Sequence, residues 1–186
     1  MLVNLCYLLV VFSRSRPRKL DTEEELYDVA LRALMRRAHS VQEMKKKLAR
    51  RTDSELLVRV VMARLKENGQ LNDERYAQQF THNRTQSRKQ GKFRIARELR
   101  ARGVPDRVIN SALEESATQT DAAAMVRQRI ERKLKSYRGE IDEKKIASIY
   151  GSLLRAGFSP DLIRAELHRI NRGSVTEVED SSDSAT

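Results

Sequence analysis

The stretch Gly103-Val-Pro-Asp-Arg-Val108-Ile-Asn-Ser-Ala-Leu113 has a counterpart later in the chain, Gly157-Phe-Ser-Pro-Asp-Leu162-Ile-Arg-Ala-Glu-Leu167. The two stretches align without a gap, with apolar residues at the same positions and a period of roughly 50 residues. Apolar residues three and four apart share one face of a helix, and a glycine just before them is typical of the left-handed residue that ends a preceding helix. The pair therefore predicts a repeated helical unit.

The same apolar spacing continues outward from these stretches, and no segment alternates between apolar and polar residues as a strand does. Repeats of this period bury their apolar faces by stacking on one another. We therefore predict an all-α fold of three tandem three-helix repeats that form an elongated, curved helical solenoid. The repeats are expected over 21–70, 71–117 and 118–171.

The first repeat fits the pattern less well than the other two. It has Arg51-Thr52 where they have a glycine and an apolar residue. Thr52 and Glu55 have the spacing of a capping box, so a helix is expected to follow Thr52. Its inward face is expected to hold Leu57, Val60, Val61 and Leu65.

Both ends of the chain are expected to lie outside the fold. Residues 1–20 begin with an apolar run, Met1 to Phe12, that is shorter than the roughly 20 residues a membrane-spanning helix needs. Its basic residues follow the run, unlike those of a secretion signal. A non-native extension and a peripheral membrane anchor both remain open. The acidic, serine-containing residues 172–186 are expected to be disordered.

The composition favours a protein that binds polyanions and argues against several classes of enzyme and metal-binding protein. Lys and Arg number 37 against 26 Asp and Glu, a formal net charge of +11, which favours polyanionic partners, nucleic acid first. The single cysteine, Cys6, cannot form an internal disulfide, and three scattered histidines offer no metal-ligand spacing. P-loop, dinucleotide and His-Glu-x-x-His motifs are absent. We therefore expect a cytoplasmic protein with no enzymatic activity, no cofactor, no metal and no stable membrane association.

Basic residues gather in three clusters, one in each repeat. The central cluster is the strongest, because Glu98 is the single acid between Thr81 and Arg102. Stacked repeats could join the clusters into a basic stripe, although a solvated helix surface is the ordinary alternative. The residues expected to contact a filament or DNA are Lys45, Lys46, Arg50, Arg84, Arg88, Lys89, Lys92, Arg94, Arg97, Arg132, Lys133 and Lys135.

Aromatic residues are scarce, at 5% of the chain. Phe93 and Tyr137 have basic neighbours and are the candidates for stacking on nucleic-acid bases. The remaining aromatics beyond the N-terminal run that fall on apolar faces are assigned to the core: Tyr76, Phe80, Tyr150 and Phe158. Base-specific readout is not expected.

Several motifs resemble one known family. The segment Arg37-Ala-His-Ser40-Val-Gln-Glu43-Met44-Lys-Lys-Lys-Leu48 is similar to the Arg-x-x-Ser-x-x-Glu-Leu-x-x-Lys-Leu signature of RecX, the bacterial regulators of the RecA recombinase. Further matches follow in the same order: Gly69-Gln-Leu71-Asn72-Asp73-Glu-Arg75-Tyr76-Ala77, then Phe80, Arg84, Gly91, Arg94-Ile95 and Leu99-x-x-x-Gly103-Val104. The resemblance extends over about residues 23 to 170. Met44 in place of leucine and the missing glycine near Arg51 depart from the pattern.

The resemblance implies a regulator that binds RecA filaments on single-stranded DNA. Such a protein suppresses ATP turnover, filament growth and strand exchange in recombination, DNA repair and the SOS response. It would contact DNA phosphates without strong sequence specificity, and a monomer is the default expectation. Two alternatives remain: a nonspecific single-stranded DNA-binding module that competes for DNA, and a passive helical scaffold whose charge serves solubility.

Overall fold

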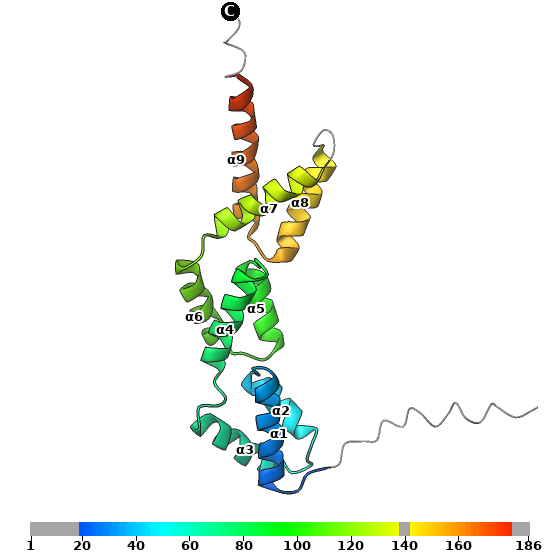
Figure 1. The fold of residues 1–186 in the computed structure, drawn as a ribbon, viewed down its shortest axis with the longest axis vertical. Helices are drawn as coiled ribbons and strands as arrows, with labels where there is room; N and C mark the ends of the chain where they lie inside the picture. The colour runs from blue at the N-terminus through cyan, green and yellow to red at the C-terminus, as the bar shows by residue number, and fades with distance from the viewer. Residues whose placement is uncertain (1–18, 138–141, 180–186) are drawn as a thin grey trace, which may run out of the picture. The chain divides into compact units, whose positions relative to one another are not determined.

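The computed structural model describes residues 19–137 and 142–179, with the side chains of 171–179 left undescribed. Within these ranges the chain forms helices joined by short turns, and no strand occurs (Figure 1). The helices are α1 (Glu23–Arg36), α2 (Val41–Ala49), α3 (Glu55–Glu67), α4 (Asp73–Gln86), α5 (Lys92–Ala101), α6 (Asp106–Thr118), α7 (Ala122–Ser136), α8 (Glu143–Ala156) and α9 (Pro160–Glu179). They make three tandem three-helix repeats, so the all-α prediction is confirmed.

The chain divides into two compact units. One contains the chain up to residue 39 together with 43–71, and the other contains 40–42 and the chain from 72 onward. The core of the first unit includes Leu26, Met44, Leu48, Val61 and Leu65, which are fully buried. The second unit has one core between α4, α5 and α6 and another between α7, α8 and α9.

The first unit corrects the expectation that all of residues 1–20 lie outside the fold. Lys19 and Leu20, assigned to the N-terminal extension, belong to the fold. The Leu20 side chain is buried and its N–H donates to the Arg51 carbonyl at 2.7 Å, while Lys19 Nζ lies 2.6 Å from Asp53 Oδ1. Residues 1–18 lie outside the described residues.

The start of α3 also differs from the sequence prediction. Ser54 is the N-cap, accepting from the Leu57 N–H, whereas Thr52 is buried and accepts from the Ser54 N–H. Val60, which the sequence pattern places in the core, is 38% exposed, and Val58 is buried there instead. The sequence prediction of the inward face is wrong because the first turns of α3 carry apolar residues on every side: Leu56, Leu57, Val58, Val60 and Val61. Apolar periodicity therefore cannot decide which face of this helix is inward.

Two glycines allow the second and third repeats to meet. The N–H of Gly91 donates to the Ala156 carbonyl at 2.9 Å, and the N–H of Phe93 donates to the Gly157 carbonyl at 3.1 Å. The carbonyls at the end of α8 thus accept hydrogen bonds from N–H groups at the start of α5. Neither group has a hydrogen-bond partner within its own helix. A Cβ on Gly91 would lie 2.2 Å from the Gly157 oxygen, so the contact requires glycine. We call this contact the glycine junction.

A second close backbone contact lies at the end of α5, at Arg102 and Gly103. The Ser40 hydroxyl donates to the Arg102 carbonyl at 2.6 Å, and a Cβ on Gly103, whose φ is +74°, would lie 2.5 Å from Gln42 Cγ. Arg51 holds the corresponding position of the first repeat. Its carbonyl accepts from Leu20 and its φ is not positive. No close approach of this kind requires a glycine there, which explains why the first repeat departs from the glycine pattern.

The C-terminal helix is longer than expected. α9 continues to Glu179, whereas the sequence predicts disorder from Arg172. Once a helix has started, each further residue adds a hydrogen bond at little cost, so a polar segment can extend it without a core. The expectation for residues 180–186 falls outside the described residues. No described helix combines the length and apolarity that crossing a bilayer requires.

The glycine junction leads to a stability prediction. We expect Gly157→Ala to lower the free energy of unfolding by about 2–5 kcal/mol, because its φ of +93° disfavours a side chain and the new Cβ would lie 2.4 Å from the Arg94 nitrogen. Gly69→Ala is the matched control, since its φ is +64° but nothing lies within 4 Å. It should cost only about 1–2 kcal/mol. Urea unfolding followed by circular dichroism measures both, and equal losses would contradict the close contact.

Candidate nucleic-acid interface

The expected binding residues fall into both units. Lys45, Lys46 and Arg50 lie in the first unit, where all three side chains are exposed. None of them forms an ion pair with another described residue. The other expected residues belong to the second unit. A single stripe through all three clusters remains a prediction.

The central cluster surrounds the turn between α4 and α5. Arg88, Lys92 and Arg97 are exposed, and Arg84 and Arg94 are partly buried. The turn itself is tight, since Lys89 has a φ of 49°, the left-handed conformation that side chains rarely adopt. α5 begins without an acidic residue in its first turn and without a side-chain cap.

Glu98 holds two of the expected binding residues in place. Its Oε1 accepts a hydrogen bond from Arg94 Nε at 3.1 Å, and its Oε2 lies 3.1 Å from Arg84 Nε in an ion pair that lacks hydrogen-bond geometry. Burial raises the pKa of Glu98, but the Arg94 hydrogen bond and the charges of Arg84, Arg94 and Arg102 outweigh it and keep the pKa below its ordinary value. The guanidinium groups of Arg84 and Arg94 are therefore already paired with an acid of the protein itself.

Phe80 is the second anchor of this arrangement. The Arg84 guanidinium lies 4.6 Å from the centre of its ring, and the Arg102 guanidinium lies 4.7 Å from it. Arg102 also donates to the Glu98 carbonyl at 2.8 Å. The sequence pattern assigns Phe80 to the core, and in the structure it is partly buried and packs against the core of α4, α5 and α6.

The glycine junction brings the third basic cluster to the central one. Arg129 of α7 donates to the Arg88 carbonyl at 3.0 Å. Burial lowers the pKa of the Arg129 guanidinium, and the charges of Arg132 and Arg94 lower it further. Arg129 therefore lies among cations from both α5 and α7. Arg129 is not among the binding residues expected from the sequence, because the sequence does not distinguish it from the other basic residues of α7.

The cations near this junction divide into two groups. We use the name cationic surface for seven residues of the α4–α5 turn, α5 and α7 whose exposed or partly exposed side chains form neither an ion pair nor a hydrogen bond with a described residue: Arg88, Lys89, Lys92, Arg97, Arg132, Lys133 and Lys135. Arg127, in the same basic run of α7, instead binds the buried Glu166 at 2.9 Å. It serves packing between α7 and α9.

The two aromatic candidates for stacking differ in the structure. Phe93 is exposed at the start of α5, within the central cluster. Tyr137 is partly buried against the core of α7, α8 and α9, with Lys145 Nζ 5.8 Å from its ring centre. Of the two, Phe93 is therefore the more accessible to a base.

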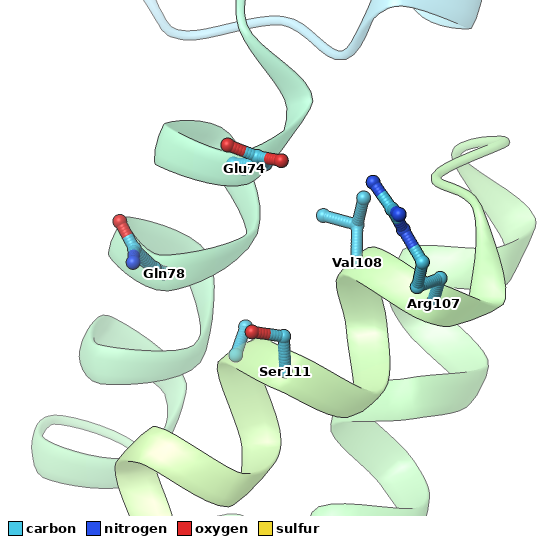
Figure 2. A pocket seen from close by; sticks show the side chains of 6 residues that line it. Glu74, Gln78, Arg107, Val108 and Ser111 are labelled. Atoms are coloured by element: carbon cyan, nitrogen blue, oxygen red, sulfur yellow. The ribbon is translucent and has the colours of Figure 1, made fainter.

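The described part of the second unit contains two notable hollows. One, of about 360 Å³, is lined by Glu74 and Gln78 of α4 and by Arg107, Val108 and Ser111 of α6 (Figure 2). A second hollow, of about 350 Å³, lies beside the glycine junction and is lined mainly by apolar residues such as Ile95, Leu113 and Phe158. Among the residues that the structure describes, no three His, Cys, Asp or Glu side chains group as metal ligands.

The Glu98 arrangement leads to a pH prediction. We expect Glu98→Gln to lower the free energy of unfolding at neutral pH by about 1–3 kcal/mol, because it leaves partly buried guanidinium groups without their counter-charge. A lowered carboxyl pKa stabilises the fold above the unfolded-state value, and that contribution disappears as the pH falls through the folded-state value. The difference between wild type and variant should therefore shrink as the pH falls below 4.5, the ordinary value.

Urea unfolding over a pH series measures this difference. Glu114→Gln is the control, since Glu114 is exposed on α6 and should change stability by no more than about 0.5 kcal/mol. A Glu98→Gln loss that stays constant through the acid range would show that the carboxylate charge is not what stabilises the site.

The chain is similar to known proteins over most of its length. Residues 72–113 match the family described as RecX, second three-helix domain. A regulatory protein RecX from Halorhodospira halophila is 39% identical over 143 residues, which cover 76% of this chain and 86% of the relative. A regulatory protein RecX from Chlorobium phaeobacteroides is 31% identical over 156 residues, covering 82% and 98% respectively.

Solved structures show the same fold. The crystal structure of RecX from Lactobacillus salivarius has a TM-score of 0.71 at 22% identity, covering 80% of this chain and 96% of that one. A second crystal structure of a regulatory protein RecX has a TM-score of 0.66 at 20% identity, covering 77% and 71%. With relatives above 30% identity matched over most of their length, this chain belongs to the RecX family of regulatory proteins.

Proposed function

We propose that this protein binds RecA filaments on single-stranded DNA and inhibits their ATP hydrolysis, growth and strand exchange. The observation that carries the proposal is the cationic surface, whose residues come from two repeats that meet at the glycine junction, where Arg129 donates to the Arg88 carbonyl. Membership of the RecX family supports the RecA filament as the target. Inhibition of this kind needs no catalytic residue, because a bound regulator can block the rearrangements on which the filament depends.

The division of the cations supports a binding role. Surface charges that serve only solubility are ordinarily mixed with acids. Here the one acid of the central span, Glu98, already pairs with Arg84 and Arg94, and Arg88, Lys92 and Arg97 form no ion pair with a described acid. Each cation that neutralises a phosphate releases a counterion, so this surface favours the DNA of the filament or acidic groups beside it.

A second candidate function uses the same surface. A module that binds single-stranded DNA nonspecifically would inhibit RecA by competing for DNA. It would act only when the DNA is nearly saturated, and added DNA would relieve it. A regulator that binds the assembled filament acts below that ratio, because each bound molecule affects neighbouring subunits.

ATP turnover by preformed RecA filaments separates the two candidates. We expect inhibition when this protein is well below both the RecA and the DNA-site concentrations. The triple variant Arg88→Ala, Lys92→Ala, Arg97→Ala should lose most of the inhibition. Its salt slope for DNA binding should fall by about 2, at roughly 0.7 per phosphate contact for a single strand.

The control variant has the same net charge. Arg59→Ala, Lys66→Ala and Arg107→Ala remove three exposed cations that are not residues of the cationic surface. This control should inhibit like wild type. Inhibition by wild type only at DNA-saturating amounts would favour simple competition, and equal losses in both variants would reduce the effect to net charge.

A further inference from the structure

Phe93 is unusual among the aromatic residues that the structure describes. Its side chain is 55% exposed, whereas the other described Phe and Tyr side chains are buried or partly buried. A single exposed apolar side chain is common on protein surfaces and needs no function. The surroundings of Phe93 therefore decide whether its exposure has a use.

The backbone at Phe93 is held rigidly. Its N–H donates to the Gly157 carbonyl at 3.1 Å, and the neighbouring Gly91 N–H donates to the Ala156 carbonyl at 2.9 Å. The end of α8 thus fixes the first turn of α5, from which the ring projects. A ring on a fixed backbone loses little freedom when a ligand stacks on it.

The charged residue beside the Phe93 ring is a cation, which would attract an anionic partner. Lys92 Nζ lies 5.4 Å from the ring centre. Lys92 stands in the first turn of α5, where the helix dipole disfavours a cation, and no acid in that turn offsets it. A local rule broken without internal compensation is expected at functional sites.

The same face of α5 continues with another cation. Arg97 follows Phe93 by four residues, so the two side chains are neighbours on the helix surface. Arg97 is exposed and forms no ion pair with a described acid. The N–H groups of Gly91 and Phe93 already donate to the carbonyls of Ala156 and Gly157, so these two groups are not available to an anion.

We propose that Phe93 is a stacking platform for a base of single-stranded DNA, with Lys92 and Arg97 on the phosphates beside that base. An aromatic face between cations is the arrangement by which proteins bind single strands without sequence preference. The inference rests on the proposed function for the presence of DNA at this surface. It adds the residue that contacts the base and the kind of contact.

The test uses the absence of tryptophan from the chain. Phe93→Trp introduces a single tryptophan at the proposed contact in the full-length protein. We expect oligodeoxythymidylate to quench its fluorescence, and an abasic oligonucleotide of the same length to leave it nearly unchanged. Both oligonucleotides carry the same phosphates, so the difference reports stacking.

Binding by fluorescence anisotropy gives the second readout. Phe93→Ala should weaken binding to oligodeoxythymidylate by roughly 5- to 100-fold and leave the salt slope unchanged. It should also bind the abasic strand about as well as wild type does. Arg97→Ala should instead lower the salt slope by about 0.7. Ile146→Ala, an exposed apolar residue at the far end of α8 from Gly157, is the control and should bind like wild type.

The outcomes separate this inference from the proposed function. An unquenched tryptophan, or a Phe93→Ala variant that keeps the wild-type preference for the base-containing strand, would overturn the stacking role even if RecA inhibition persists. A wild-type protein that fails to inhibit RecA while the quenching remains would overturn the proposed function and leave the stacking site in place. A Phe93→Ala variant that weakens filament binding with unchanged binding to free oligonucleotide would assign the ring to a protein contact instead, which also overturns the inference.

Discussion

The hydrogen bonds between the end of α8 and the start of α5 are the contact on which the arrangement of the second unit depends. They pair carbonyls and N–H groups that two separate helices would leave to water, and they exist only because Gly91 and Gly157 let the backbones touch. The contact brings α7 to the turn after α4, where Arg129 reaches the Arg88 carbonyl. A backbone constraint between two repeats thus determines which cations become neighbours.

The basic residues then have two different uses. Glu98 and Phe80 hold Arg84, Arg94 and Arg102, and Glu166 holds Arg127. These guanidinium groups stabilise packing. The residues of the cationic surface have no such partners and remain available to an external polyanion. Counting charges along the chain therefore overstates the binding surface, because it treats both groups alike.

Much of the fold could be predicted from the sequence. The left-handed glycines 69, 103 and 157 mark helix ends, and Asn72 and Asp121 cap the helices that follow them. The face of α3 could not be predicted, because its first turns are apolar on every side. For the candidate site, the sequence indicated the central cluster and Phe93. It could not separate Arg84 from Arg88, since that difference depends on Glu98 lying across the α4–α5 turn, and it gave no sign that Arg129 joins the clusters.

The most direct test of the account is lysine footprinting of the full chain, free and bound to RecA filaments, by acetylation and mass spectrometry. Lys92 and Lys133 belong to the cationic surface, whereas Lys66 and Lys144 are exposed but are not among its residues. The account predicts that filament binding protects Lys92 and Lys133 and leaves Lys66 and Lys144 reactive. Protection of Lys66 and Lys144 with Lys92 and Lys133 still fully modified would contradict it, because the filament would then contact residues outside the cationic surface.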